Sequence, residues 1–484
     1  MAEDRGEPML TERHFQATTP TQERRVWLVV ATACVGAFMG QMDASVTQLI
    51  LPVLEHDYRA SVDQVSWVSV IYLLIAAVLL PVFGRLSDIY GRKMFYLCGF
   101  AVFVLGSALS GLAPNLGLLI CARALQGIGS AILGANSVAI IVSVAGERLR
   151  GRALGIQAAV QAVGLCTGPA VGGIIVSELN WRWVFWINVP IGIAGALAAA
   201  LVIPQSGGNA SGERFDRWGA VLLTPALGAF VFAVNQVGAW GLASPAVLMA
   251  AVLAGVLLAV FAWWEAGNPS PLISLALFRN ASFALGNIVG MMANAVLFGV
   301  FFLIPFTLER AFRDTPLSAG FRLTLVPLML AVVGPVSGTL ADQLGAHILC
   351  SAGMLTAAGG LGLLYIALDP SSPSLEMLTV ALGIFGVGLG IFLAPNNSAI
   401  MGSAPPSEVG EAGSVMNVVR ALGMSIGIAF TSTILASQIA GGAAGVQTIG
   451  LAPREMSEAA RVVVAVFCGL SLLASGVSVL RSNR

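Results

Sequence analysis

The chain has 484 residues and a formal net charge of zero, with 57% hydrophobic and only 10% charged side chains. Ordinary globular domains carry about 25% charged residues, so this composition excludes a soluble domain of this size. The few charges lie between long apolar runs and cancel one another, which also argues against a nucleic-acid partner.

Six stretches contain no Asp, Glu, Lys or Arg, and each exceeds the ~20 residues that cross ~30 Å of hydrocarbon. They cover residues 94–122, 153–177, 183–212, 280–308, 377–407 and 421–453. A longer charge-free run, 218–264, holds a turn-like segment from Gly238 to Pro245 and is interpreted as two crossings.

In chain order, the pattern predicts a polar tail and then fourteen membrane-spanning helices. The tail, residues 1–25, lacks the cleavage site of a signal peptide. The predicted spans cover residues 26–52, 64–83, 94–113, 116–142, 151–176, 183–203, 218–237, 245–263, 282–307, 318–338, 347–367, 376–401, 411–436 and 461–480.

Two landmarks indicate an internal repeat. The glycines and the aspartate of GRLSDIYGRK (84–93) recur in GTLADQLGAH (338–347) at an offset of 254 residues. The ending LILPVLE (49–55) resembles FLIPFTLE (302–309), with its proline offset by 253. The two offsets agree within one residue, so the first six and last six spans are interpreted as duplicated bundles. Such bundles are typical of transporters with alternating access.

The repeat predicts four regions. Residues 1–25 form an N-terminal tail, and 26–203 the first six-helix bundle. Residues 204–280 hold a linker, two inserted spans and an interfacial segment, and 281–484 the second six-helix bundle with a short tail.

Basic residues in the first half favour one orientation of the predicted spans. The side of the N-terminus holds Arg5, Arg13, Arg24, Arg25, Arg85, Arg92, Lys93, Arg148, Arg150, Arg152, Arg214 and Arg217, whereas the opposite side holds only Arg59 and Arg182. By the positive-inside rule, both termini are expected in the cytoplasm. The second half shows no such bias.

Several motifs together resemble the fourteen-span drug:proton antiporters of the major facilitator superfamily, the EmrB/QacA type. The resemblance covers nearly the whole chain. It rests on GRLSDIYGRK (84–93), RALQGIG (123–129), GLCTGPAVGG (164–173), WRWVFWINVPIG (181–192), PLISLALFRN (271–280) and the pair Asn417 and Arg420. It implies an all-α major facilitator fold with two six-helix bundles and two additional central spans.

Asp43 is the only acidic residue well inside a predicted span. A carboxylate in hydrocarbon is costly and tends to hold a proton until it is hydrated or paired, as a proton carrier must. A structural hydrogen bond or a place on a wet vestibule wall is the alternative. Arg123 is expected at a similar depth, and the resemblance ties Arg123 and Gln126 to proton movement. The alternative for Arg123 is bonding to backbone carbonyls of the first span.

Three further groups of residues take their roles from the resemblance. Gly84, Arg85, Asp88, Gly91 and Arg92 form a gating loop in which Asp88 is expected to bond the start of the thirteenth span; an ordinary solvated turn is the alternative. Gly164, Gly168, Pro169, Gly172 and Gly173 form an exporter motif whose glycines permit close helix approach. Asn417 and Arg420 are assigned to the cavity, with an anchor to the tenth or fourteenth span as the alternative.

The sequence shows no Walker loop, catalytic triad or metal-ligand cluster, so we expect a transporter and not an enzyme. The resemblance implies export of small lipophilic or cationic compounds across a bacterial cytoplasmic membrane, driven by a proton gradient without a cofactor. The lipid bilayer, small-molecule substrates and protons are the expected partners, and no accessory export partner is indicated. The alternatives are a dedicated exporter of one metabolite, such as an antibiotic or siderophore, and a non-transporting receptor or scaffold.

The predicted topology can be tested with reporter fusions. Reporters placed after residue 15, within 204–217 and at the C-terminus should all read as cytoplasmic, because an even number of spans separates them. An external reading at the C-terminus would mean an odd number of spans.

Overall fold

A computed structural model describes the chain apart from residues 1–19, 206–215, 269–270, 406–407, 441–446 and 481–484. The described residues form helices and loops without a strand, and fourteen helical segments are long and apolar enough to cross a membrane. The predicted all-helical class and number of spans are confirmed.

The helices follow the duplicated plan. The first bundle contains α1 (Pro20–Tyr58), α2 (Val62–Tyr90), α3 (Arg92–Leu112), α4 (Leu116–Glu178), the short α5 (Trp183–Trp186) and α6 (Asn188–Val202). The inserted pair is α7 (Arg217–Trp240) and α8 (Pro245–Gly267), followed by the 3-10 helix η1 (Leu275–Arg279). The second bundle contains α9 (Ala281–Arg310), α10 (Pro316–Leu344), α11 (Ala346–Ala367), α12 (Leu375–Gly402), α13 (Val409–Ala440) and α14 (Pro453–Leu480).

The helix α4 joins two spans that the sequence separates at residues 143–150. At 1.5 Å per residue, its 63 residues would make a straight rod of about 95 Å, three times the hydrocarbon thickness. Gly146 interrupts the rod with φ 59° and ψ 179°, which are not helical angles. The chain therefore crosses twice, over Leu116–Gly146 and Leu149–Glu178.

Two turn glycines show that the repeat extends to the backbone. Gly91 follows α2 with φ 108°, and Gly345 follows α10 with φ 88°. Residues other than glycine rarely adopt such φ angles, because their Cβ atom would clash with the backbone. Each glycine turns the chain directly into the next helix, so the shared spacing of the two loops reflects a shared geometry.

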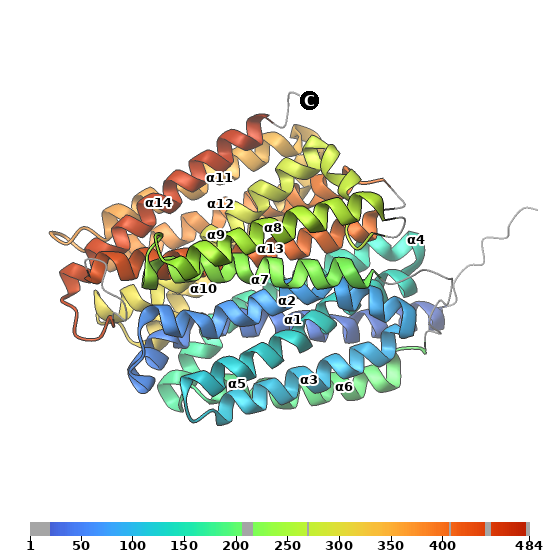
Figure 1. Cartoon of the computed structure of the whole chain (residues 1–484), viewed down its shortest axis with the longest axis horizontal. Helices are drawn as coiled ribbons and strands as arrows, with labels where there is room; N and C mark the ends of the chain where they lie inside the picture. Colours follow the sequence, from blue (N-terminus) through green and yellow to red (C-terminus); the bar gives the residue numbers. More distant parts are fainter. Residues whose placement is uncertain (1–19, 206–215, 269–270, 406–407, 441–446, 481–484) are drawn as a thin grey trace, which may run out of the picture.

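The two halves meet along three pairs of helices: α1 with α9, α2 with α13, and α4 with α10. In Figure 1 the helices run side by side, and α1 begins at the same end of the molecule at which α14 finishes. We call this the terminal end, and the opposite end, where α1 finishes at Tyr58, the far end.

The inserted helices are central in sequence but peripheral in space. α7 packs on α2 and on α13, whereas α8 packs chiefly on α7 (Figure 1). Asn235 of α7 donates to Ser66 Oγ of α2 at 3.1 Å, and Thr433 of α13 donates to the Val234 carbonyl at 3.5 Å. Thus α7 lies over the seam between the halves.

Parts of the predicted regions lie outside the described residues, namely most of the N-terminal tail, the middle of the 204–217 linker and the C-terminal tail. The region boundaries and the orientation in the membrane stay predictions.

Candidate functional site

A buried polar cluster surrounds Asp43 of α1. Arg123 Nη1 donates to Asp43 Oδ2 at 2.5 Å, while Gln126 Nε2 and Asn188 Nδ2 donate to Oδ1 at 2.8 and 3.0 Å. All four side chains are 0% exposed. Every donor points at the carboxylate, an arrangement suited to its ionised form. A buried ion pair of this kind is stabilised when its remaining polar atoms also find partners; in this cluster Arg123 Nη2 and Asn188 Oδ1 are enclosed without one among the described residues.

Arg123 is held by more than its ion pair. Its Nε donates to the Val68 carbonyl at 3.0 Å, and its Nη1 also contacts Gln126 Oε1 at 2.6 Å. Its Cζ lies 4.2 Å from the centre of the Tyr72 ring. The carbonyl it bonds belongs to α2, not to the first span as the structural alternative supposes.

The sequence analysis did not assign Asn188 to this cluster, although Asn188 lies within the quoted motif WRWVFWINVPIG. Ser107 Oγ accepts from Gln126 at 3.2 Å and from Asn188 at 3.3 Å, so α3 completes the cluster. Gly106 permits this approach, because a Cβ built there would lie 2.6 Å from the backbone nitrogen of Gln126.

The exporter motif brings α4 against α1. A Cβ built on Gly164 would lie 2.7 Å from the Phe38 carbonyl oxygen, and one on Gly168 would lie 2.9 Å from that of Met42. One on Gly172 would likewise press on α1. These three glycines therefore allow α4 to approach α1, the helix that carries Asp43.

The same motif also meets the second half. A Cβ on Gly173 would lie 2.8 Å from the Pro316 carbonyl oxygen at the start of α10. A Cβ on Gly320 of α10 would collide with the Pro169 carbonyl oxygen. The motif thus lies between α1 and α10, and its close contacts with α10 are at the far end.

A carboxylate joins the halves at the far end. Glu55 of α1 is fully buried and accepts hydrogen bonds from the backbone nitrogen and the hydroxyl of Thr448, which precedes α14. Arg310 of α9 donates to Glu55 at 3.5 Å, and Gln447 donates to the Arg59 carbonyl at 2.7 Å. We call Glu55, Arg310 and Thr448 the far-end clasp.

The first predicted span, residues 26–52, ends before Glu55, and this boundary is wrong. The predicted span ends at Pro52, but α1 continues to Tyr58. A proline removes one donor without forcing a helix to stop when its neighbours pack tightly. Glu55 therefore lies on a buried turn of helix.

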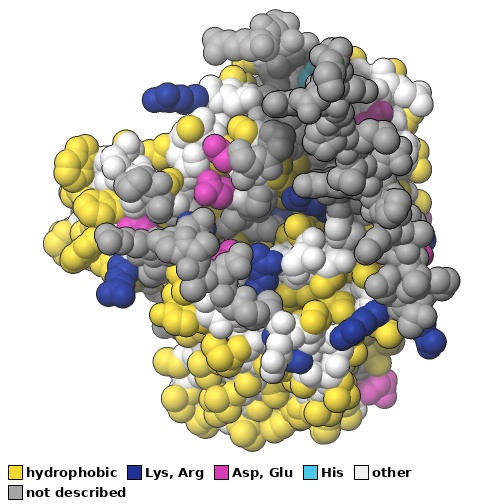
Figure 2. Space-filling view, turned by 90° about the vertical axis from the view of Figure 1, so that its right-hand side faces the viewer, with side chains coloured by type: hydrophobic (Ala, Val, Ile, Leu, Met, Phe, Trp, Pro, Cys, Tyr) yellow, Lys and Arg dark blue, Asp and Glu magenta, His cyan; other side chains and the backbone are white. Residues whose placement is uncertain are grey.

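The terminal end holds a cavity of about 580 Å³, which we call the vestibule. Its wall includes the gating-loop residues Gly84, Arg85, Asp88 and Arg92, with Glu411 of α13 opposite. Figure 2 looks onto this end, where charged side chains lie across the face and hydrophobic ones gather toward the left and lower margins.

The residues predicted as a gating loop are mostly helical, because α2 continues past the predicted end at residue 83 to Tyr90 and only Gly91 separates it from α3. They are braced within the first half. Asp88 accepts from Arg92 at 2.8 Å, and Arg92 Nη1 donates to the Ala139 carbonyl of α4 at 3.1 Å. The expected bond from Asp88 to the start of α13 stays a prediction.

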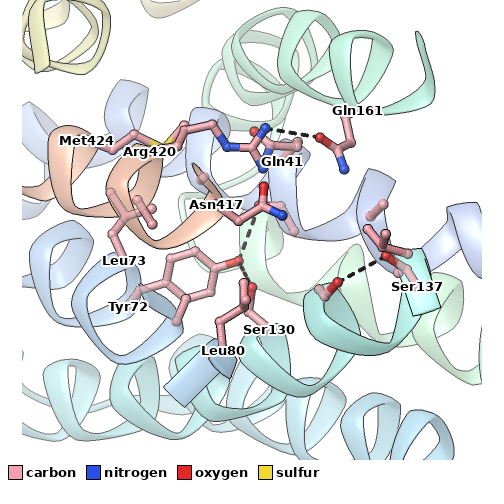
Figure 3. Close-up of a pocket in the computed structure, with 18 residues that line it drawn as sticks. Gln41, Tyr72, Leu73, Leu80, Ser130, Ser137, Gln161, Asn417, Arg420 and Met424 are labelled. Carbon is pink, nitrogen blue, oxygen red and sulfur yellow. Dashed lines mark hydrogen bonds between the residues drawn. The ribbon is translucent and has the colours of Figure 1, made fainter. Parts of the chain in front are cut away.

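A smaller cavity of about 90 Å³, the inner pocket, adjoins the vestibule. Leu80, Gly134, Val138 and Asn417 line both spaces. Figure 3 shows Arg420 reaching across the inner pocket toward Gln161 of α4, and Arg420 Nη1 donates to Gln161 Oε1 at 3.3 Å.

Arg420 therefore reaches the other half of the molecule, and not the tenth or fourteenth span as the structural alternative supposes. On its other side lies a space of about 10 Å³, lined by Asn287, Asn294, Asn396 and Asn397 among others. The sequence analysis did not single out Gln161.

The predicted proton and cavity residues thus fall into two places. Asp43, Arg123 and Gln126 are together inside the first bundle, and Asn417 and Arg420 lie between the bundles. Asp43 is not among the residues that line the inner pocket. Within the described ranges, no group of three His, Cys, Asp or Glu side chains could hold a metal ion.

Comparison with known proteins gives consistent relatives. The family model of the Major Facilitator Superfamily matches residues 33–428. The chain is 32% identical to the riboflavin transporter RibZ of Clostridioides difficile, over 86% of this chain and 90% of that one. It is 32% identical to the multidrug resistance protein Stp of Mycobacterium tuberculosis H37Rv, over 84% and 75%. It is 29% identical to the tetracenomycin C resistance and export protein of Streptomyces glaucescens, over 89% and 81%.

Solved structures share the fold at low identity. A bacterial homologue of the human lysosomal transporter Spinster, in an inward-facing and unoccupied conformation, matches with a TM-score of 0.66 and 15% identity over 96% of this chain and 98% of that one. An auto-inhibited peptide transporter of the POT family also scores 0.66 at 15% identity, over 95% and 97%.

The close approach of α1 and α4 predicts that Gly168→Leu destabilises the protein, because Leu would need space that the backbone of α1 occupies. Overpacking typically costs about 1–3 kcal/mol. The midpoint of thermal unfolding of the purified protein should fall. Gly155→Leu is the matched control, because Gly155 lies in the same helix with nothing within 4 Å of a built Cβ. Equal midpoints for the two variants would contradict the packing argument.

The far-end clasp predicts that Glu55→Gln lowers stability more than Glu309→Gln. Hydrogen bonds to a charged group contribute about 1.5–3 kcal/mol, and those of Glu55 join the halves. Glu309 pairs at 2.8 Å with the same Arg310 but lies beside it in α9. A double-mutant cycle of Glu55→Gln with Thr448→Val should give a coupling of about 0.5 kcal/mol or more. Additive effects would mean that the two residues do not act together.

Proposed function

The chain belongs to the Major Facilitator Superfamily, and from this we propose that it is a proton-coupled antiporter that exports small lipophilic compounds, including drugs. It is a multi-pass membrane transporter and not an enzyme. Its relatives include multidrug resistance transporters. The proposal adds the direction of transport, the proton and the class of substrate.

The buried Asp43–Arg123 pair carries the proposal. A carboxylate that is fully buried in a membrane helix and salt-bridged at 2.5 Å must have a role that outweighs its cost. Protonating Asp43 would neutralise the carboxylate and free Arg123, while losing the proton would restore the pair. Two arrangements of one cluster, selected by one proton, are what coupling requires.

The two ends of the molecule differ in closure, as alternating access requires, and the direction of export is supported by the similarity to the tetracenomycin C resistance and export protein. Close packing and the clasp shut the far end, whereas the vestibule leads from the terminal end to the inner pocket. With both termini in the cytoplasm, as the charge bias predicts, this state would admit substrate from the cytoplasm. A proton gradient would then supply the energy without a cofactor, in a bacterial cytoplasmic membrane.

A transporter dedicated to one metabolite is the second candidate. It is favoured by the similarity to a riboflavin transporter and to a tetracenomycin C export protein. Competition among unrelated compounds would support the multidrug proposal, whereas uptake of a single compound into inverted vesicles would support the dedicated one.

Cationic substrates are not retained in the proposal. A cationic substrate needs a negative partner, and Asp43, the one acidic residue well inside a predicted span, does not line the inner pocket.

Asp43→Asn should abolish uphill transport in inverted membrane vesicles with an imposed pH gradient, because an amide cannot cycle a proton. Downhill equilibration of a neutral substrate should persist. Glu376→Gln is the control, since Glu376 is an exposed acid in the first turn of α12. Undiminished uphill transport by the Asp43→Asn protein would refute the proposed proton coupling.

A second variant shows whether the loss of transport comes from misfolding of the first. Removing one partner of a buried ion pair costs about 3–5 kcal/mol, because the other charge stays buried. Asp43→Asn combined with Arg123→Gln leaves no unpaired charge and should show the same loss of uphill transport.

A further inference from the structure

The inner pocket has a cationic wall. Of the 18 residues that line it, Arg420 alone carries a full charge, and the others are small, apolar or neutral polar. The asparagine-lined space beside it likewise has Arg420 as its one charged residue. A molecule in the inner pocket would therefore meet a positive charge and no carboxylate.

Arg420 has donors that the protein does not use. A guanidinium offers five N–H groups. Among the described residues its hydrogen-bond partner is Gln161 alone, at 3.3 Å. None of its nitrogens is among the enclosed side-chain atoms that lack a partner, so the unused donors face open space. Figure 3 shows the guanidinium extended across the pocket toward Gln41 and Gln161.

A charge in this position calls for a counter-charge. A buried guanidinium without an anion is unfavourable, and ionisable residues inside membrane spans generally mark substrate or ion pathways. Planar guanidinium groups pair best with carboxylates, which accept two parallel hydrogen bonds, and such bonds strengthen where water is scarce.

The one acidic residue well inside a predicted span of the first bundle already has partners. Asp43 is fully buried, and Arg123, Gln126 and Asn188 occupy its oxygens. It therefore neither neutralises Arg420 within the pocket nor offers a partner to a cationic substrate.

The approach to the pocket has the same sign. The vestibule wall carries Arg85, Arg92 and Arg150 against Asp88 and Glu411, an excess of one positive charge. Deeper in, apolar and neutral polar side chains surround the single charge, which suits a hydrophobic frame with one anionic group. Leu73, Leu80, the Tyr72 ring and Met424 belong to this part of the wall.

From these observations we infer that the transported molecules are lipophilic weak acids, and that the Arg420 guanidinium binds their carboxylate or phenolate oxygen in the inner pocket. The inference rests on the proposed function, because it names the substrate class of that site. Gln161 and Asn417 would flank the bound group, and the hydrophobic frame would extend toward the vestibule.

Equilibrium binding to the purified full chain tests this inference without a proton gradient. The probes are matched pairs on one frame, fluorescein against rhodamine 123 and naphthaleneacetate against naphthylmethylammonium. The acids should bind about tenfold or more tighter than their cationic partners. Arg420→Gln should weaken the acids by about tenfold, the loss expected for one charge-assisted hydrogen bond, and leave the cations unchanged or slightly tighter.

Two further variants complete the design. Arg420→Lys keeps the charge but not the planar fork, so it should retain part of the preference for acids, and it replaces Arg420→Gln if that protein fails to fold. Arg279→Gln removes an exposed arginine of η1 and should leave both affinities unchanged. Tighter binding of the cations by the unmodified chain, no binding of either acid, or full acid affinity without Arg420 would each overturn the inference.

Transport of the same pairs separates the two proposals. Acids that bind through Arg420 but are not driven by a pH gradient would refute proton coupling and leave the substrate class standing. Gradient-driven movement of the cations alone would refute the substrate class and leave the antiporter standing.

Discussion

The ion pair between Asp43 and Arg123 places the strongest constraint on the first bundle. Two opposite charges in a membrane interior are stabilised when they touch and when other donors and acceptors surround them. This requirement draws α1, α2, α3, α4 and α6 to one point, because Val68, Ser107 and Asn188 each supply a partner. Small residues at Gly106 and Gly168 then follow from the short distances between these helices. The chemistry at the centre and the packing around it are thus one arrangement.

The second bundle handles its charge differently. Arg420 faces space and the other half of the protein, with Gln161 as its described partner. In the proposed mechanism, the self-contained pair in the first bundle would respond to a proton, and the open charge between the bundles would respond to a bound molecule. When the two halves move relative to each other, the surroundings of Arg420 change directly. The Asp43 cluster lies within one bundle and therefore moves as a unit.

The sequence predicts the fold well because membrane helices need long apolar runs and the repeat fixes their grouping. Asp43 and Arg123 were predictable as one pair, because charged residues are rare in such runs and their depth follows from helical rise. Gln126 joined them only through the family resemblance. Glu55 was not predictable, since the decision between a helix end and a loop at Pro52 depends on packing. Gln161 and Asn188 carry no charge and show their importance only through the partners that the fold brings to them. The break between the fourth and fifth spans was predictable at residues 143–150, and the Gly146 turn lies within it.

Because of the position of α7, the two lateral sides of the transporter differ in how far they are shielded from the lipid. The halves part along two lateral seams, one between α2 and α13 and the other between α4 and α10. α7 spans the first seam and is bonded to both of its helices, and α8 lies outside it. Acyl chains, and hydrophobic solutes dissolved among them, are thereby kept from the first seam. A solute that passes laterally from the bilayer into the protein would then have one side on which to enter, along α4 and α10. There the glycines of both helices already bring the backbones into contact.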